Sequence, residues 1–307
     1  TLLPVSPTSN YGMASDYNDG TATYATLAHT HRFDGDTELT TRVRRGAYTR
    51  DQRASTIRLT AGENLSNFGP STVLTRGTQN KIQDLDSVYL QSDLSAKFDA
   101  LGVRHELLSG IDVAREQKTV YAARTAAQGL GGVDLIKPNT TVGTPDDGAW
   151  VNESSRVLRV NNQYTSTAWG VYAQDLVQIA PHWKLLGGLR YDNLNGNYDT
   201  FAAPAANVSN GVLTNYKMNV GEWSKRVGAL FQPNERESYH FSAATSFNTS
   251  GDAYSLGASN ADVPPEQSIN LELGAKIDSA DKNFTTRYAL FRSTKLHERN
   301  TDPLVDV

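Results

Sequence analysis

Cysteine is absent from this chain of 307 residues. Disulfides, thiolate metal sites and cysteine nucleophiles are therefore excluded. The chain also lacks any run of 18 apolar residues, so no membrane-spanning helix is expected, and residues 1–10 lack the basic segment and apolar core of a signal peptide. The net charge of −4 gives no signature of polyanion binding, so nucleic acid is not an expected partner.

The sequence is instead rich in residues that favour strands. It contains 14 Tyr, 9 Phe, 4 Trp and 30 Thr, spread along the whole length. A chain too polar to fold would be poor in aromatic residues, whereas Thr and Tyr fit the pleated surface of a sheet. The composition therefore predicts an ordered all-β protein.

Alternation of apolar and polar residues gives the next signal, because neighbouring side chains of a strand point to opposite faces. Residues 88–98 alternate in this way, a turn follows at 99–102, and residues 103–116 alternate again, which predicts a β-hairpin. The same unit recurs along the chain. The five predicted strand pairs are 21–33 with 38–48, 87–98 with 103–116, 165–179 with 183–192, 222–232 with 238–248, and 268–277 with 284–294.

The connections between the predicted strands alternate in length. Each turn inside a pair is short, and an up-and-down sheet would place these turns at one end and the remaining connections at the other. Long strands with short turns at one end and long loops at the other are typical of an outer-membrane β-barrel. The pattern therefore predicts an antiparallel, up-and-down transmembrane β-barrel that is partial, with about ten strands in one domain over residues 1–307. The predicted long loops are 49–86, 117–164, 193–221 and 249–267.

Charged side chains gather on one face of the predicted strands. Arg42 and Arg44 share a face of one strand, and Glu272 and Lys276 share a face of another. An Arg or Lys turned toward lipid at mid-depth costs about 2 to 4 kcal/mol, so these faces are expected to look inward. Asp175 departs from the pattern because it is in register with apolar neighbours, and we expect a bulge there or a position beyond the lipid.

Several stretches resemble the barrel of TonB-dependent siderophore receptors. The hairpin of Gly170–Asp175 and Trp183–Asp192 is similar to the family passage YAQD … W … LLGGLRYD. Trp223–Gly228 is similar to the WSxRxG strand, and Pro265–Lys276 to the passage PExS … ELGAK. These motifs follow one another in the order that the family has.

The earlier part of the chain shows the same resemblance. Leu94–Phe98 with His105–Glu116 is similar to the family hairpin DLxAKF … HxLLxGxDxxRE. Thr49–Ser55 and Leu74–Gly77 resemble the branch that takes up ferric siderophores of the catecholate type.

The resemblance implies a receptor of the bacterial outer membrane that transports ferric siderophores with energy from the inner-membrane TonB complex. It implies neither an enzyme nor a bound cofactor, since the siderophore is cargo. The implied partners are a ferric siderophore, outer-membrane lipid and lipopolysaccharide, and TonB through a plug.

Family members also carry a signal peptide, an energy-coupling box and a globular plug ahead of a 22-stranded barrel. None of these is seen ahead of the predicted strands, and about ten strands are visible. The chain is therefore expected to be the middle of a receptor barrel, without plug, coupling box or closing strands.

Signatures of enzymes are absent from the sequence: it has no G-x-S-x-G motif and no P-loop. His29 and His31 would share a strand face at a spacing that could chelate a metal, but no nearby carboxylate or Cys completes such a site. We therefore expect neither catalysis nor a metal centre.

Recognition of an anionic, flat ferric catecholate would need Arg for charge and aromatic faces for stacking. The predicted loops 49–86 and 117–164 supply Arg, and 117–164 also supplies Tyr and Trp, whereas 249–267 has no basic residue. The first two loops are therefore the expected ligand-binding elements. The candidate ligand-binding residues are Arg50, Arg53, Arg76, Tyr121, Arg124, Trp150 and Arg156.

Two other functions fit parts of the sequence. A passive porin-type channel would use the same barrel, with lumen charges selecting solutes by size and sign. A soluble all-β module for carbohydrate binding or adhesion would share the composition but not the consistent difference between the two ends. The sequence does not specify which siderophore a receptor of this kind would bind.

Overall fold

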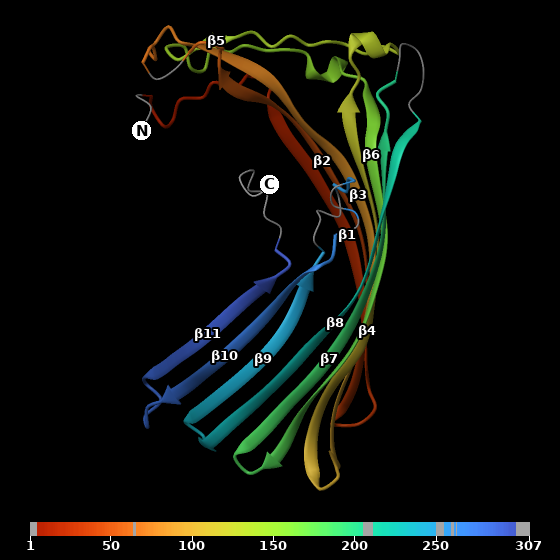
Figure 1. The fold of residues 1–307 in the computed structure, drawn as a ribbon, viewed down its shortest axis with the longest axis vertical. Helices are drawn as coiled ribbons and strands as arrows, with labels where there is room; N and C mark the ends of the chain where they lie inside the picture. The colour runs from red at the N-terminus through yellow and green to blue at the C-terminus, as the bar shows by residue number, and fades with distance from the viewer. Residues whose placement is uncertain are drawn as a thin grey trace, which may run out of the picture.

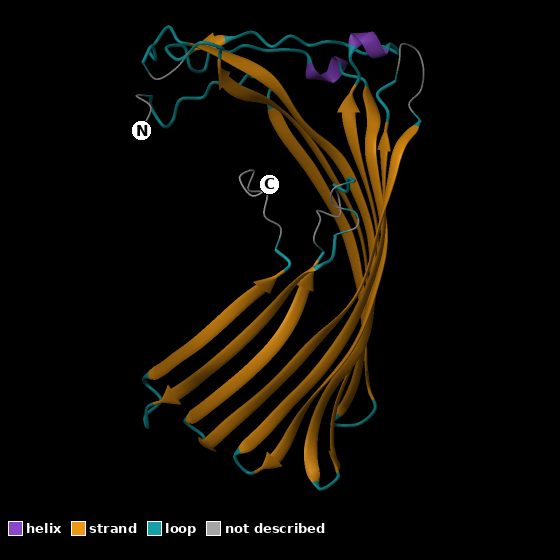
Figure 2. Cartoon of the chain, in the orientation of Figure 1, coloured by secondary structure: helices purple, strands orange, loops and turns teal. Residues whose placement is uncertain are grey.

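A computed structural model of the chain describes residues 5–63, 66–204, 211–249, 255–258, 261 and 263–298. These residues form one antiparallel sheet that curves around a hollow open on one side (Figures 1 and 2). The strands are β1 (Tyr17–Arg32), β2 (Thr37–Leu59), β3 (Val73–Ala100), β4 (Val103–Ala123), β5 (Thr140–Thr141), β6 (Leu158–Ala180), β7 (Trp183–Phe201), β8 (Val212–Asn234), β9 (Glu237–Asn248), β10 (Glu266–Asp278) and β11 (Thr285–Leu296).

The strands are neighbours in space in the order in which they follow one another in sequence. The order is β1-β2-β3-β4-β6-β7-β8-β9-β10-β11, and β5 pairs with β3 outside this path. All short turns lie at one end of the sheet and all long connections at the other, here called the turn end and the loop end (Figure 1). The predicted up-and-down architecture is confirmed, and the strands form one continuous sheet.

Several strands extend well beyond their predicted ends. β2 continues to Leu59 and β3 begins at Val73, so their connection is 60–72 instead of 49–86. The connections after β4, β7 and β9 are 124–157, 202–211 and 249–265, where 117–164, 193–221 and 249–267 were predicted. The alternation of apolar and polar residues stops within these strands, whereas the backbone hydrogen bonding continues, so alternation alone misses the extensions.

The two faces of the sheet differ in polarity, as predicted. On the outer face, Leu189 of β7 and Leu271 of β10 are 54% and 40% exposed. The inner face carries the charged residues and is covered in part by the connection after β9, through Leu256. An apolar wall of this extent is unusual on a protein surrounded by water and fits contact with lipid. Further exposed apolar side chains of the outer face are Val88, Ile111, Val171, Leu185, Val227, Phe241, Ile269, Leu273 and Leu290.

Two clusters of aromatic rings border this apolar wall. Near the loop end, the ring of Tyr191 lies 5.4 Å from that of Trp169 and 5.1 Å from that of Trp223. Near the turn end, the rings of Trp183 and Phe231 lie 4.6 Å apart. Trp183 and Tyr191 are eight residues apart on β7, about 26 Å along the strand and about 20 Å across a tilted barrel wall. This spacing approaches the roughly 25 Å apolar band that aromatic girdles border in outer-membrane barrels.

Asp175 does not sit at a bulge. Its neighbours across the ladders, Leu107 and Gly187, are in regular register, and the irregularity in the pairing of β6 with β7 falls between Gln178 and Ala180. Asp175 also lies between the two aromatic clusters, within the apolar wall. The expected bulge and the expected position beyond the lipid are therefore both wrong. Instead, the imidazole Nδ1 of His105 lies 2.6 Å from Asp175 Oδ2 and partners this oxygen of the carboxylate, while Asp175 Oδ1 is buried without a hydrogen bond.

The sheet divides between β8 and β9. Their ladder begins at Arg226 opposite Ala244 and runs to the turn end, and on the loop-end side of this pair the two strands diverge (Figure 1). In the described part of the chain, β1 and β11 each pair on one side only, so the sheet is not closed into a barrel. The helices of the described residues are the short 3-10 turns η1 (Ala126–Gln128) and η2 (Glu153–Ser155), and none could span a bilayer.

The orientation of the two faces predicts a difference between neighbouring substitutions. Leu271→Arg would place a cation on the outer face, and we expect it to destabilise the assembled protein by about 2 to 4 kcal/mol. Asn270→Arg, one residue away on the inner face, should cost little because that face is polar. Urea unfolding of the complete protein in lipid vesicles, carrying either substitution, measures both free energies. Equal losses would contradict the assignment of faces.

Candidate functional site

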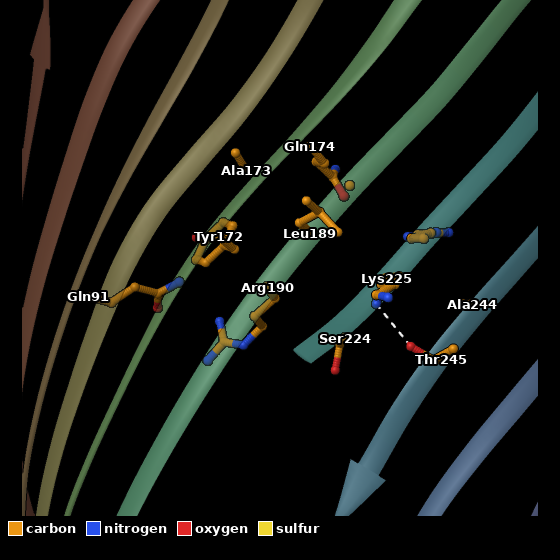
Figure 3. A pocket seen from close by; sticks show the side chains of 12 residues that line it. Gln91, Tyr172, Ala173, Gln174, Leu189, Arg190, Ser224, Lys225, Ala244 and Thr245 are labelled. Carbon is orange, nitrogen blue, oxygen red and sulfur yellow. Dashed lines mark hydrogen bonds between the residues drawn. The ribbon is translucent and has the colours of Figure 1, made fainter. Parts of the chain in front are cut away.

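A network of charged side chains crosses the inner face of the sheet near mid-height. The guanidinium of Arg190 on β7 donates to Asp192 Oδ2 at 2.8 Å and lies 2.9 Å from Asp112 Oδ2 on β4. It also lies over the ring of Tyr172 on β6, 5.4 Å from the centroid, and the Tyr172 hydroxyl donates to Asp93 on β3. Figure 3 shows Tyr172 and Arg190 side by side on their strands.

Two glycines make room for this network. A Cβ at Gly110 would lie 2.7 Å from the Tyr172 hydroxyl, and one at Gly170 would collide with the guanidinium of Arg190. Arg42 on β2 extends the network, with its Nη1 3.2 Å from Asp93 Oδ2. The inner wall is therefore tied across five strands by opposite charges, in agreement with the prediction that Arg42 faces inward.

A cavity of about 340 Å³ lies where β8 and β9 diverge (Figure 3). Cationic and neutral polar side chains line it, and it crosses the wall at the fork, where the amide of Lys225 donates to Thr245 Oγ1 at 3.0 Å. Its basic lining residues are Arg190, Lys225 and Arg226. Since Arg190 is already neutralised by two carboxylates, the other two cations define the charge of this cavity.

At the loop end, a second network joins the connection 124–157 to β2 and to the segment before β1. The ammonium of Lys137 is 1% exposed and donates to Asp16 Oδ1, to the carbonyl of Ala54 and to Ser55 Oγ, at 3.0 to 3.1 Å. It also lies 3.6 Å from Glu153 Oε1. Burial alone would raise the pKa of Asp16, but the hydrogen bonds from Met13, Ser55 and Lys137 outweigh it and lower that pKa.

Glu153 of η2 is the shared acid of this network. Arg156 lies 2.6 Å from Glu153 Oε2, and Arg53 on β2 donates to the backbone carbonyl of Glu153. Arg53 in turn binds both carboxylate oxygens of Asp51 at 2.9 and 3.0 Å. Arg53 and Arg156 are thus buried and paired, and they fix the loop against the strand.

Arg76 on β3 holds the same loop at a second point. Its side chain is fully buried, and it donates to the carbonyls of Tyr11 and Pro138 at 2.7 and 3.3 Å and to Asp147 Oδ1 at 2.8 Å. The hydrogen bond from Arg76, supported by the amide of Ala149, lowers the pKa of Asp147 to about 2. Asp147 therefore remains charged at any physiological pH.

The candidate ligand residues fall into different environments from those predicted. Arg50, Arg53 and Arg76 lie on strands β2 and β3, and Tyr121 lies on β4, so their placement in loops was wrong. The cause is the extension of these strands beyond the alternating region. Arg124, Trp150 and Arg156 do lie in the connection 124–157, as predicted.

The remaining candidates differ in whether their side chains are exposed and in which groups they hydrogen-bond. Arg124 is buried and donates to the carbonyl of Gln128 at 3.4 Å. Tyr121 donates to Asp84 Oδ2 at 2.9 Å. The ring of Trp150 is 63% exposed, and Arg50 is held by two neutral amide oxygens, Asn18 Oδ1 at 3.2 Å and Gln52 Oε1 at 2.6 Å.

Sequence reasoning missed the residues that organise the loop end, namely Asp16, Lys137 and Glu153. Lys137 and Asp16 are 121 residues apart, and no local pattern marks either of them. Their only signal in the sequence is that each stands in a segment outside the alternating strands.

The pair of histidines on β1 shows no metal-site geometry. The rings of His29 and His31 lie 6.4 Å apart, and His31 packs edge-on against Phe33 at 4.5 Å. No group of three or more potential metal ligands occurs within the described ranges.

Comparison with known proteins gives a match over nearly the whole chain. A family model described as "TonB dependent receptor-like, beta-barrel" matches residues 3–306. The catecholate siderophore receptor Fiu of Escherichia coli K12 is 24% identical over 314 residues, which cover 92% of this chain and 39% of that protein. The probable TonB-dependent siderophore receptor PiuA of Acinetobacter baumannii is 25% identical over 234 residues, 71% of this chain and 31% of that protein.

Solved structures show the same fold. The crystal structure of the ferric-catecholate import receptor Fiu from E. coli K12, in its closed form, has a TM-score of 0.80 at 22% identity and covers 95% of this chain and 43% of that one. The PiuA structure from A. baumannii has a TM-score of 0.78 at 20% identity and covers 94% and 42%. The ferripyoverdine receptor of the outer membrane of Pseudomonas aeruginosa has a TM-score of 0.71 at 16% identity and covers 96% and 36%.

The loop-end network predicts the effect of removing its central cation. Lys137→Ala would leave Asp16 and Glu153 buried without their shared partner, and we expect the connection 124–157 to lose about 3 to 5 kcal/mol of local stability. Lys81→Ala, which removes an exposed lysine of β3, is the matched control. Hydrogen exchange of the complete protein should show lost protection in 124–157 for the first variant alone. Unchanged protection in Lys137→Ala would contradict the role of this network.

The lowered pKa of Asp147 predicts a dependence on acid. The carboxylate contact with Arg76 is at full strength above the ordinary pKa of Asp, 3.8, and is lost as the pH falls through about 2. The protection factor of the amide of Ala149, which donates to Asp147, should therefore fall between about pH 4 and pH 2, once the slower intrinsic exchange in acid is divided out. In Asp147→Asn, the same amide should show no such acid step. A step of equal size in the variant would assign it to another group.

Proposed function

This chain belongs to the TonB-dependent receptor β-barrel family, and we propose that it forms part of the barrel of an outer-membrane receptor for ferric siderophores. The match of the family model over residues 3–306 is the observation that carries this proposal. The apolar outer wall, bordered by aromatic rings and free of charge except for a few side chains, supports the same placement. Receptors of this family transport a ligand and perform no catalysis, so we propose no enzymatic activity.

The chain spans 39% of the length of the Fiu proteins to which it is similar. We propose that residues 1–307 form a single partial barrel domain of a larger receptor. The open sheet, whose end strands β1 and β11 keep a free edge in the described residues, supports this proposal. Coupling to TonB would then require a plug and coupling segment of the complete receptor, as the resemblance implies.

A ferric siderophore of the catecholate type is the proposed cargo. The Fiu proteins that this chain resembles are named as catecholate receptors, which favours this class over other siderophores. Such a ligand is anionic and has flat aromatic rings, so a receptor gains most from an uncompensated cation and an exposed ring. Arg50 and Trp150 have these properties, because Arg50 is bound only by neutral groups and Trp150 is exposed.

The other candidates would act indirectly. Arg53, Arg76 and Arg156 are engaged by carboxylates, and their charge is not available to a ligand without breaking those pairs. We propose that they position the loop that carries Trp150. Arg124 and Tyr121 are also engaged in contacts and would contribute in the same way.

A porin-type channel is the remaining rival for a barrel of this kind. It would discriminate solutes by size and sign and would show no saturable affinity for one ligand. A saturable affinity for ferric siderophore in the complete receptor separates the two functions.

The test of the proposal is ligand affinity in the complete receptor purified in detergent. We expect Arg50→Ala and Trp150→Ala each to weaken binding of a ferric catecholate about tenfold, the equivalent of roughly 1.4 kcal/mol. Trp150→Phe, which keeps an aromatic face, should retain most of the affinity, and Trp183→Ala at the turn end should leave it unchanged. Fluorescence quenching on titration with the ferric siderophore measures all four variants. Normal affinity in both alanine variants at the loop end would contradict these two roles.

A further inference from the structure

A groove on the outer face lies directly beyond the loop-end aromatic cluster. Two rows of residues line it, each crossing neighbouring strands in register. The first row is Arg115 on β4, Thr167 on β6, Asn195 on β7 and Asn219 on β8, and the second is formed by Thr165, Asn197 and Lys217. The groove has a volume of about 350 Å³.

The charge of the groove is positive. Arg115 and Lys217 stand at its two sides, and no Asp or Glu is among the described residues that line it. Neither cation forms an ion pair or a hydrogen bond within the described ranges. The nearest acid along the outer face of β7 is Asp199, and it is already bound by the amides of Asn197 and Asn215.

The neutral side chains of the groove are exposed hydrogen-bond donors. Thr167, Asn195 and Asn219 are exposed, and each can donate a hydrogen bond from a hydroxyl or an amide. Two cations separated by a row of such donors match the needs of a phosphate group, which accepts several hydrogen bonds and carries negative charge.

The position of the groove relative to the aromatic cluster indicates which molecule carries the phosphate. On the turn-end side of the groove, Trp169 is the next outward residue of β6, and Asn193 and then Tyr191 are the next outward residues of β7. The rings of Trp169 and Tyr191 belong to the aromatic cluster that borders the apolar wall. Residues just beyond such a girdle are at the level of lipid headgroups. The groove lies on the long-loop side, which in outer-membrane barrels is the external side. The lipid of that leaflet is lipopolysaccharide, whose lipid A carries phosphates.

We propose that this groove binds a phosphate of lipid A on the outer wall of the barrel. The planar guanidinium of Arg115 would donate hydrogen bonds to the phosphate oxygens, and Lys217 would supply a second positive charge. The Thr and Asn side chains between them would donate further hydrogen bonds. The acyl chains would then run along the apolar wall past Trp169 and Val171. This inference rests on the placement of the barrel in the outer membrane and not on the identity of the transported ligand.

The experiment uses the complete receptor, delipidated in detergent and titrated with purified lipid A. We expect the Arg115→Ala/Lys217→Ala double variant to bind lipid A at least tenfold more weakly than the parent, as measured by native mass spectrometry. Arg115→Lys/Lys217→Arg keeps both charges and should recover most of the affinity. Lys81→Ala, which removes an exposed lysine from the inner face of β3, is the matched control and should bind normally.

The source of the phosphate is tested with two further probes. Dephosphorylated lipid A should bind the parent no better than intact lipid A binds the double variant. Inorganic phosphate at millimolar concentration should not displace lipid A.

Three results would overturn the proposal. They are equal binding of lipid A by parent and double variant, equal binding of intact and dephosphorylated lipid A by the parent, and displacement of lipid A by inorganic phosphate. Ferric siderophore affinity of the double variant should be normal, which separates a failure of this proposal from a failure of the proposed transport function.

Discussion

The near-exclusion of charge from the outer face of the sheet is the constraint on which the rest of this structure depends. Lipid offers no partner to a charged group, so the side chains between the two aromatic clusters must be apolar on the outer face, and the charges must turn inward. The inner network around Arg190 follows from this segregation, because charges brought onto one face of a sheet can neutralise one another across strands. Some charges do face outward. Asp175 is paired with His105, whereas Lys225 on β8 and Arg292 on β11 stand on the outer face opposite Leu189 and Leu271.

The same constraint explains what could be predicted from the sequence. Lipid forces the strict alternation of residues such as Val88–Phe98, and this part of each strand was placed correctly, together with the order of strands and the segregation of loops and turns. Beyond the lipid the constraint ends but the hydrogen bonding of the sheet does not. The stretches of β2 and β3 that carry Arg50 and Arg76 therefore look like loops in the sequence and are strands in the structure.

The organisation of the loop end could not be predicted for a different reason. Lys137 meets Asp16 and Glu153 from connections that are far apart in the sequence, and each residue alone resembles an ordinary solvated charge. Only the folded arrangement shows that Arg53, Arg76 and Arg156 are buried and neutralised. Composition identified the loop end as basic, yet much of that basic charge holds the loop in place, which leaves Arg50 and Trp150 as the groups most open to a ligand.

The most direct test of this account asks which residues of β7 contact lipid. Single cysteines can be introduced between Trp183 and Tyr191, in a stretch that has none of its own, and spin-labelled in lipid vesicles after any cysteine elsewhere in the complete protein has been replaced. The account predicts a period of two: labels at Leu185, Gly187 and Leu189 collide with dissolved oxygen in the bilayer, and labels at the even-numbered positions between them do not. Equal oxygen accessibility at odd and even positions, or the opposite phase, would contradict a barrel wall in this orientation.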